Sequence, residues 1–508
     1  MNFNSLDFAW FMPLVFAVYW LVLGRSWRAQ NVWILVMSYL FYGWWDWRFC
    51  FLLSGATIVT FACALPATHR KLWTTVAVCA NLANLVFFKY FHFFGNGLRR
   101  LFEVFGWMPD WFTIDILLPV GISFFTFQAI SYSVDVYRGE TLPTRNFVAF
   151  AGFISFFPQL VAGPIERSTQ LLPQFLERRT WDYARAVRGM RLILWGLFKK
   201  CAVADGLIEL VNLLWNDWSD DMSSRIYFRS AICFAIQIYA DFSGYCDIAR
   251  GAAALLGFKL SVNFQYPYFS RNIIEFWHRW HISLMNWFTK YVYIPIGGSR
   301  RGNRYLNVLV VFLLSGLWHG ANLTFVIWGL LCGLLYIAAL AGGARRYRPA
   351  DTPPADRKDM VGMIVTFLLL ALSWVFFRAP DLHYAMRAFA LLGPESVIMA
   401  ALCIGVGWLI TRLPRKFNFT IIFALLTVAA VGWVIYRPDP GITAVFMRRG
   451  MFAAILMFMV EWRGRHNSFA LESMPRNRYV RLAAYLALYL IIITAAADTD
   501  EPFLYFQF

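Results

Sequence analysis

The chain has 508 residues, of which 60% are hydrophobic and only 15% are charged. A soluble globular protein carries about 25% charged residues, so this composition excludes an ordinary soluble domain and indicates a protein that crosses a membrane several times. The formal net charge of +17 does not indicate a nucleic-acid partner, because the lysines and arginines lie in short loops between apolar runs. In such loops they determine topology and attract anionic membrane lipid.

The eight cysteines give no sign of a metal centre. None stands in a CxxC pair or at a cysteine–histidine spacing typical of zinc sites. Most lie in or beside apolar runs, where we expect small core residues, and Cys246 is the only one within a longer motif. We therefore predict a protein without a bound metal.

The apolar runs predict the membrane helices. The first run, Phe8–Leu23, lacks a basic segment before it and is followed by RSWR, so we expect it to remain as a helix rather than to be cleaved as a signal peptide. Basic loops alternate with the others, which places the N-terminus outside the cytoplasm. We predict helices near residues 8–23, 31–46, 49–66, 72–91, 190–214, 227–257, 306–318, 322–342, 360–378, 397–411, 418–436, 445–461 and 480–497.

Two apolar stretches, Ile116–Tyr137 and Ser155–Pro164, are interrupted by proline and glycine. Such stretches predict broken or re-entrant helices, which are tolerated at membrane depth where they are buried in protein or line a cavity. The charged connection Glu166–Arg191 predicts an amphipathic surface helix. At about 20 residues per crossing we expect roughly 11–14 spans or half-spans, all within one integral membrane domain, residues 1–508.

The stretch from Glu275 to Gly320 holds three of the seven histidines, His278, His281 and His319. His319 closes an apolar run. Because ionisable groups at membrane depth are costly, they often mark a reaction centre or a pathway, which makes His319 a functional candidate. The alternative is a packed histidine that bonds to a backbone carbonyl.

At 100° per residue, the aromatic residues between Phe276 and Tyr291 fall on one face, with Arg279, Asn286 and Lys290 opposite. This pattern predicts one amphipathic helix, interfacial or re-entrant, with His281 at the edge of its apolar face.

Several motifs resemble one family, the membrane-bound O-acyltransferases, and in particular its bacterial polysaccharide branch, which includes alginate O-acetyltransferase and the teichoic-acid D-alanylation acyltransferase. They occur here in the order that the family shows. The motifs are Leu117–Gly139, Ser155–Arg167, Tyr239–Phe258, Asn263–Arg271, FWHRWHISL (Phe276–Leu284), YIPIGG (Tyr293–Gly298) and SGLWHGA (Ser315–Ala321).

The resemblance implies an all-α multi-spanning fold, a ring of tilted and re-entrant helices around a central funnel or tunnel, with core motifs at residues 117–335. It assigns catalysis to His319, which would deprotonate the attacking hydroxyl, a task suited to a group of pKa about 6.5. His281 would orient the donor, polarise the acyl carbonyl or share the proton, whereas His278 is interpreted as structural. We predict that the donor tunnel is lined by Trp277, Trp318, Asn263 and Arg271.

The resemblance also implies the reaction partners. The donor would be acetyl-CoA or another short acyl thioester in the cytoplasm, and the acceptor an exported polysaccharide, alginate-like or cellulose-like. A separate extracytoplasmic acyltransferase would modify the glycan, and the chain would lie in the bacterial inner membrane. Two alternatives from other classes remain open at this point, a transporter or flippase and a non-catalytic scaffold of an export complex.

The tail Asp498–Phe508 ends in FLYFQF, which resembles the FxYxxF ending of a small membrane partner in teichoic-acid D-alanylation. Basic residues before the last run place this tail outside the cytoplasm. We predict that Tyr505 carries the acyl group, since a phenol of pKa about 10 becomes a nucleophile beside a histidine base. The alternative is an interfacial aromatic anchor.

Asp241 and Asp247 lie six residues apart, so they do not share one helical face and poorly support a paired-carboxylate mechanism. We expect them to pair with Arg250 or Arg271, or to bond to a buried amide. Gly244, Gly251 and Gly257 are expected to let helices approach closely.

Overall fold

The computed structural model describes residues 1–91, 93, 95, 102, 105, 117–216, 224–344, 353–412 and 444–496. Every regular element in these ranges is helical. The helices are α1 (Leu6–Ala17), α2 (Trp27–Gly43), α3 (Phe49–Ala64), α4 (Arg70–Leu85), α6 (Ile122–Tyr137), α7 (Phe147–Ser155), α8 (Phe157–Leu160), α9 (Ser168–Leu176), α10 (Tyr183–Leu197), α11 (Asp205–Asn216), α12 (Ser224–Leu255), α13 (Ile273–Arg279), α14 (Ile282–Phe288), α15 (Arg304–His319), α16 (Leu323–Ala341), α17 (Met360–Arg378), α18 (Leu382–Ala390), α19 (Pro394–Arg412), α21 (Ala444–Gly464) and α22 (Arg478–Ala496).

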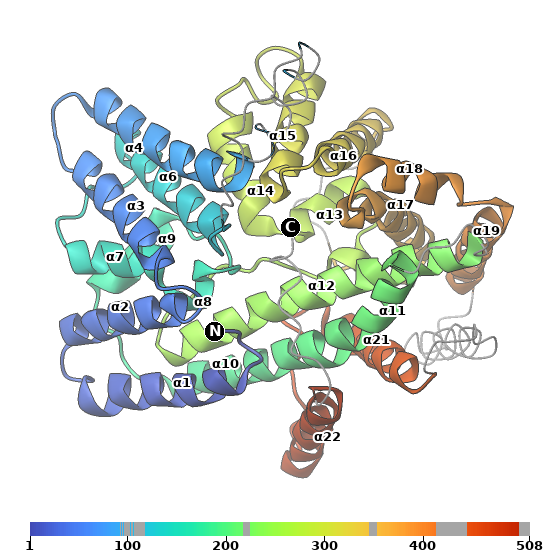
Figure 1. The fold of residues 1–508 in the computed structure, drawn as a ribbon. Coiled ribbons are helices and arrows are strands. Elements are labelled where there is room, and N and C mark those ends of the chain that lie inside the picture. The colour runs from blue at the N-terminus through green and yellow to red at the C-terminus, as the bar shows by residue number, and fades with distance from the viewer. Residues whose placement is uncertain are drawn as a thin grey trace.

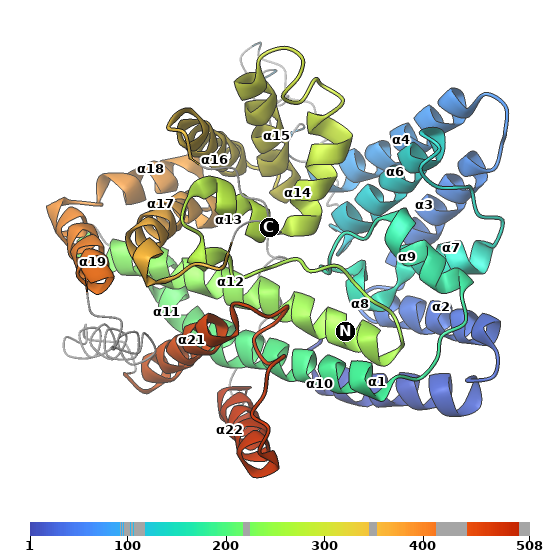
Figure 2. The same ribbon diagram turned by 180° about the vertical axis from the view of Figure 1, so that it is seen from behind.

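Helices α10 and α12 run side by side through the middle of the molecule (Figure 1, Figure 2). In Figure 1, α1 to α9 fill the left part and α16 to α19 the right part, with α13 to α15 between them above the central pair. Two buried apolar clusters follow this division, and Leu197 and Phe264 pack against both. The segment around Phe264 therefore lies where the two cores meet.

The contact between α10 and α12 depends on glycine. A Cβ atom on Gly251 would come 2.5 Å from the Gly189 carbonyl oxygen, and one on Gly244 would come 2.8 Å from the Gly196 oxygen. Gly244 and Gly251 thus permit close packing, as expected. Gly257 has another role, because its φ of 86° lies in the left-handed region that glycine adopts without steric cost.

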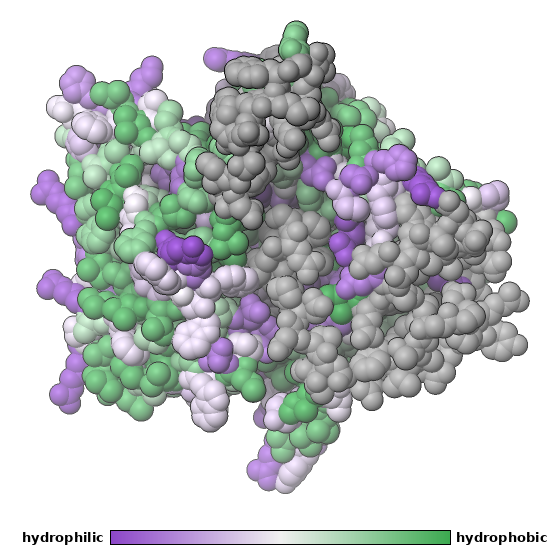
Figure 3. Space-filling model, viewed as in Figure 1, coloured by the Kyte–Doolittle hydropathy of each residue, from purple (hydrophilic) through white to green (hydrophobic). Residues whose placement is uncertain are grey.

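Four described helices are long and apolar enough to cross a membrane, judged by length and composition. They are Arg70–Tyr90, Leu323–Ala341, Arg357–Arg378 and Arg478–Ala495. Only 17% of the apolar window of the first and 11% of that of the last is buried in the protein, so both present most of their apolar surface outward. Hydrophobic residues also cover much of the surface over α1 to α4 (Figure 3), as in a protein surrounded by lipid.

The interruption predicted for Ser155–Pro164 is confirmed, whereas in Ile116–Tyr137 only the described part before α6 is non-helical and the helix itself is unbroken. Gly121, with φ of 77°, precedes the first residue of α6, and α7 ends at Ser155 before the short helix α8. The predicted run at 418–436 and the tail at 498–508 lie outside the described residues.

The single amphipathic helix predicted between Phe276 and Tyr291 is wrong. The chain breaks between α13 and α14, where Trp280 is extended and His281 is left-handed with φ of 44°. The amide of Ile282 donates to the Asn263 carbonyl at 2.9 Å instead of continuing the helix. The predicted apolar face therefore does not run across the break.

The surface helix predicted over Glu166–Arg191 is also wrong in extent. Two helices occupy this stretch, because α9 ends at Leu176 and α10 begins after Asp182, whose side chain accepts from the Arg185 amide at 3.1 Å. An aspartate in this position fixes a helix start, and α10 then continues into the next apolar run.

Candidate active site

His281 lies in the break between α13 and α14 and is only 1% exposed. A left-handed backbone is uncommon for a residue with a side chain and costs about 1–3 kcal/mol, so the surrounding contacts must impose it. Residues in such conformations cluster at functional sites. The left-handed backbone therefore indicates a functional role for His281 independently of the sequence motif.

The Asn263 side chain holds the His281 ring in one tautomer. Asn263 Oδ1 accepts from the Ser283 amide at 3.1 Å and from Ser283 Oγ at 2.9 Å, and it lies 3.2 Å from His281 Nδ1. A backbone amide can only donate, so the shared Asn263 atom is the carbonyl oxygen. His281 Nδ1 must then carry the proton, which leaves a lone pair on Nε2.

His281 Nε2 is buried and has no hydrogen-bond partner among the residues that the structure describes. Aromatic rings surround the imidazole, with ring centroids 4.8 Å away at Phe242 and 6.0 Å away at Trp318. A buried acceptor without a partner is costly, so this nitrogen suits a hydroxyl or a proton brought by a substrate.

His319 is the last residue of α15 and is 6% exposed. Its ring centroid lies 5.0 Å from that of Trp318 and 5.2 Å from those of Trp328 and Phe377. Trp318 therefore contacts both histidine rings. The structure brings together the two predicted catalytic histidines, Trp318 and Asn263, from segments far apart in the sequence.

Lys89 is a further residue of this site, which our sequence reasoning missed. It lies in a π-helical segment, Val86–Tyr90, and its ammonium donates to the carbonyl oxygens of Trp318 at 2.6 Å and His319 at 3.0 Å. A cation is favourable at the C-terminal end of a helix, where carbonyls lack partners. The signal was a lone lysine in an apolar run, to which the rule applied to His319 also applies.

The other predicted site residues lie farther from the pair. Trp277 packs on Phe312 and Trp328, with centroids 5.1 and 6.0 Å apart, and Trp328 in turn packs on the His319 ring. Arg271 is in an ion pair with Glu275 at 2.8 Å. Their part in a donor tunnel stays a prediction.

Two expectations about other side chains can be compared with the structure. The His278 side chain is exposed, whereas the side chains of His281 and His319 are buried. Asp247 pairs with Arg250 at 3.1 Å, as expected, and also with Lys199 at 2.7 Å. Asp241 pairs instead with Lys200 at 2.9 Å. Tyr505 lies outside the described residues. Within the described residues, no group of three or more His, Cys, Asp or Glu side chains could hold a metal ion.

Comparison with known proteins places this arrangement in a class. Residues 143–378, which include both buried histidines, match the model of the membrane-bound O-acyltransferase family. The chain belongs to this family, and it is accordingly an acyltransferase rather than a transporter or a scaffold.

Relatives extend the match along the chain. A probable alginate O-acetylase of Pseudomonas putida is 35% identical over 98% of this chain and 98% of its own length. A peptidoglycan O-acetyltransferase of Helicobacter pylori is 29% identical over 98% of this chain and 95% of its own. A teichoic acid D-alanyltransferase of Bacillus subtilis is 26% identical over 52% of this chain and 70% of its own.

The role of Asn263 can be tested by substitution. We expect Asn263→Leu, of similar size but without an acceptor, to lower acyl transfer by roughly 10–100-fold, the loss that follows removal of a partner that orients a histidine. Asn263→Asp keeps the acceptor for Nδ1–H and should retain more activity. Transfer rates of the two purified variants provide the measurement, and equal activity of Asn263→Leu and the unchanged protein would contradict the assignment.

The role of Lys89 can be tested in the same way. Lys89→Met keeps the aliphatic stem but leaves the Trp318 and His319 carbonyls without their donor, which should destabilise the folded chain by about 1–3 kcal/mol and slow transfer. Lys89→Arg should restore part of both, because it restores a cationic donor. Thermal unfolding in detergent and the transfer rate are the two readouts, and wild-type behaviour of Lys89→Met in both would exclude this role.

Proposed function

We propose that this protein moves an acetyl group from a cytoplasmic thioester across the bacterial inner membrane for O-acetylation of an exported polysaccharide. The observation that carries the proposal is a buried histidine, His281, whose Nε2 has a lone pair and no protein partner, beside Trp318 and His319. The names of the relatives support the acetyl group and the extracytoplasmic glycan. We also propose that the whole chain forms one membrane domain whose helices surround a funnel ending at His319.

The chemistry follows from the two histidines. His319 takes the proton from the attacking hydroxyl, and the hydroxyl oxygen adds to the thioester carbonyl carbon. The carbon–sulfur bond then breaks, the thiolate leaves, and the proton held by the imidazole passes to it. His281 Nε2 accepts a hydrogen bond from the hydroxyl and shares the proton. Aromatic walls exclude water, which would otherwise compete as the acceptor.

The proposed donor is acetyl-CoA or another short acyl thioester. Family membership implies an acyl donor, and a cytoplasmic one fits the basic loops, which attract an anion. The relatives named as acetylases or O-acetyltransferases match 75–98% of this chain, whereas the D-alanyltransferase of Bacillus subtilis matches 52% of it. This difference favours acetyl over D-alanyl transfer.

We propose that the acetyl group leaves the membrane on Tyr505 of the tail. In this scheme the phenol attacks the thioester with His319 as base, and the acetyl-tyrosine then donates to a separate periplasmic transferase that acts on the polysaccharide. A phenolate is a good leaving group, so the ester stays reactive. An alginate-like or cellulose-like glycan would be the final acceptor.

The histidines provide the first test of this proposal. His319→Ala should abolish transfer and His281→Ala should reduce it strongly, because both remove a nitrogen from the buried pair, whereas His278→Ala on the exposed side of α13 should have a mild effect. The measurement is the acetyl content of the exported glycan in cells that carry only the variant. Unchanged acetylation with His319→Ala would refute the proposal, and equal severe loss at His278 and His281 would refute the division of roles.

The tail provides the second test. Tyr505→Phe keeps the aromatic ring and deletes only the hydroxyl, so it should abolish glycan acetylation if the phenol carries the acetyl group. Tyr489→Phe on α22 is the matched control, because Tyr489 is an exposed tyrosine that lies 16 residues earlier in the chain. Normal acetylation with Tyr505→Phe would leave the tail as an anchor and exclude the relay.

A further inference from the structure

A basic cavity of about 910 Å³ lies between the turn before α10, the first half of α10, the end of α12 and the segment 257–262. Six cationic side chains and two carboxylates, Glu177 and Asp182, line it. The cavity is at the upper end of the size range of ligand pockets. The cations of this basic cavity are Arg178, Arg179, Arg185, Arg188, Arg250 and Lys259.

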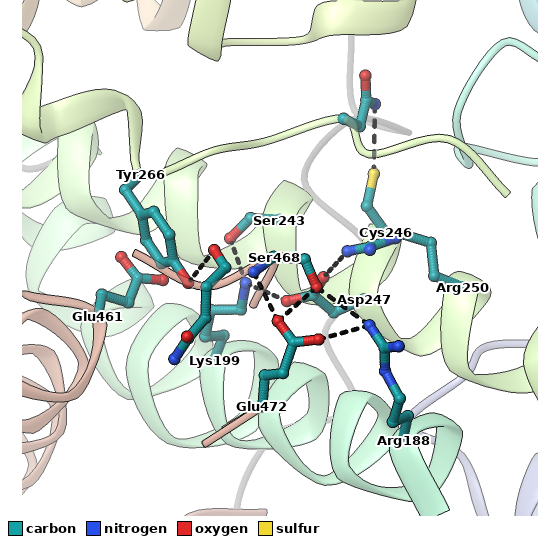
Figure 4. A network of polar contacts seen from close by, with 12 residues as sticks. Arg188, Lys199, Ser243, Cys246, Asp247, Arg250, Tyr266, Glu461, Ser468 and Glu472 are labelled. Carbon is teal, nitrogen blue, oxygen red and sulfur yellow. Dashed lines mark hydrogen bonds and ion pairs between the residues drawn. The ribbon is translucent and has the colours of Figure 1, made fainter. Parts of the chain in front are cut away.

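Three of these cations are engaged in holding the walls. Arg179 donates to Asn31 Oδ1 at 2.7 Å and to the Trp27 carbonyl at 3.2 Å. Arg188 pairs with Glu472 at 2.6 Å, and Arg185 donates to the Gly257 carbonyl at 2.8 Å (Figure 4 shows the Arg188 pair). These arginines connect α2, α10, the end of α12 and the loop after α21.

The other three have donors left for a ligand. Arg250 is 12% exposed and bonds through one nitrogen to Asp247 at 3.1 Å, while Asp247 also pairs with Lys199 at 2.7 Å (Figure 4). Asp247 thus serves two cations, and Glu472 and Glu166 also lie close enough to Arg250 to interact with it. Arg178 and Lys259 are exposed, and the structure gives their side chains no hydrogen bond or ion pair.

The basic cavity opens on the face of the protein that is expected to be cytoplasmic. Arg179 contacts Trp27, the first residue of α2, which lies between Arg25 and Arg28. Arg188 contacts Glu472 in the loop that precedes Arg476 and Arg478. Loops rich in arginine and lysine face the cytoplasm. An anion from the cytoplasm can therefore reach the cavity.

One wall of the basic cavity leads directly to the candidate active site. Ser261 and Val262 line the cavity, and the next residue, Asn263, is the one that holds His281. The Ser261 amide and hydroxyl bond to Glu166, at 2.5 and 3.0 Å, which fixes this segment. The Asn263 support of His281 therefore follows directly, along the chain, after two residues that line the cavity.

We propose that the basic cavity binds the phosphate groups of the donor, the nucleotide part of an acyl thioester, while the acyl arm extends toward His281. Guanidinium groups recognise phosphate oxygens through paired hydrogen bonds, which suits Arg178 and Arg250. An anionic lipid headgroup offers the same phosphate chemistry, but the continuity with Asn263 favours the nucleotide. This inference rests on the proposed thioester donor.

The test uses the full-length protein in nanodiscs of phosphatidylcholine and 3′-phospho-ADP as the probe, with binding measured by titration calorimetry. We expect saturable binding that weakens at least about tenfold in Arg250→Gln, Lys259→Gln and Arg178→Gln, which is about 1.4 kcal/mol. Lys71→Gln is the matched control, since it removes an exposed cation at the start of α4, outside the cavity, and it should bind like the unchanged protein. Wild-type affinity in all three cavity variants would overturn the proposal.

Two further comparisons separate the possible causes. Arg250→Gln removes one partner of a partly buried ion pair, so the thermal unfolding of this variant is measured as well. If Arg250→Gln does not fold, the variants of the exposed residues Lys259 and Arg178 decide the outcome. Nanodiscs of phosphatidylglycerol should leave nucleotide binding unchanged. If phosphatidylglycerol instead displaces the nucleotide, and does so less well in the Lys259 and Arg178 variants, the cavity binds a lipid headgroup. In that case its assignment to the nucleotide of the donor is wrong.

The outcome is distinguishable from that of the proposed function. His319→Ala should bind 3′-phospho-ADP like the unchanged protein although it transfers no acetyl group. If the cavity variants bind 3′-phospho-ADP like the unchanged protein while His319→Ala transfers no acetyl group, only the proposed nucleotide site is wrong. If His319→Ala still transfers the acetyl group while the cavity variants bind the nucleotide more weakly, only the catalytic role proposed for His319 is wrong.

Discussion

The candidate active site depends on two irregular backbone segments that satisfy each other's hydrogen bonds. The Ile282 amide donates to the Asn263 carbonyl at 2.9 Å, and the Gln265 amide donates to the Arg279 carbonyl at 3.0 Å. Peptide groups at membrane depth cannot find water, so a helix can break there only where protein supplies the partners. The extended segment after α12 supplies them for the break between α13 and α14, and the Asn263 side chain then bonds to both His281 and Ser283.

The charges around this centre are arranged so that the interior holds few unpaired ones. Lys199 pairs with Asp247 at 2.7 Å, and Lys200 lies 2.8 Å from Asp205 and 2.9 Å from Asp241. Removing one partner of a buried pair costs about 3–5 kcal/mol, because it leaves an uncompensated charge. These pairs therefore connect α11 and α12 to the π-helical segment Phe198–Ala204 that follows α10. His281 Nε2, in contrast, is a buried polar atom without a hydrogen-bond partner among the described residues.

The sequence predicted element positions well where membrane physics dominates. The apolar runs agree with α1 to α4 and with α15 to α17, because a lipid-facing helix must be continuous and apolar. The sequence analysis did not predict the break at His281. A period of 3.6 residues shows which face of a helix would be apolar, but it does not show that Asn263, from another segment, takes the hydrogen bond of the Ile282 amide. Lys89 had a sequence signal, a lone lysine in an apolar run, but its partners could not be predicted, because they are the backbone carbonyls of Trp318 and His319.

The glycines of the SGLWHGA motif show how packing places His319. A Cβ atom on Gly316 would come 2.3 Å from the Phe325 carbonyl oxygen, and one on Gly320 would come 2.1 Å from the Phe325 ring. Both glycines thus let α15 and α16 approach closely, and the Phe325 ring then packs on Phe377, which contacts His319. With Lys89 bonded to the two carbonyls at the end of α15, the helix end is fixed from both sides. A base that must meet a hydroxyl within hydrogen-bond distance needs this rigidity, because small displacements lose much of the rate. The motif therefore encodes the position of the histidine as well as its identity.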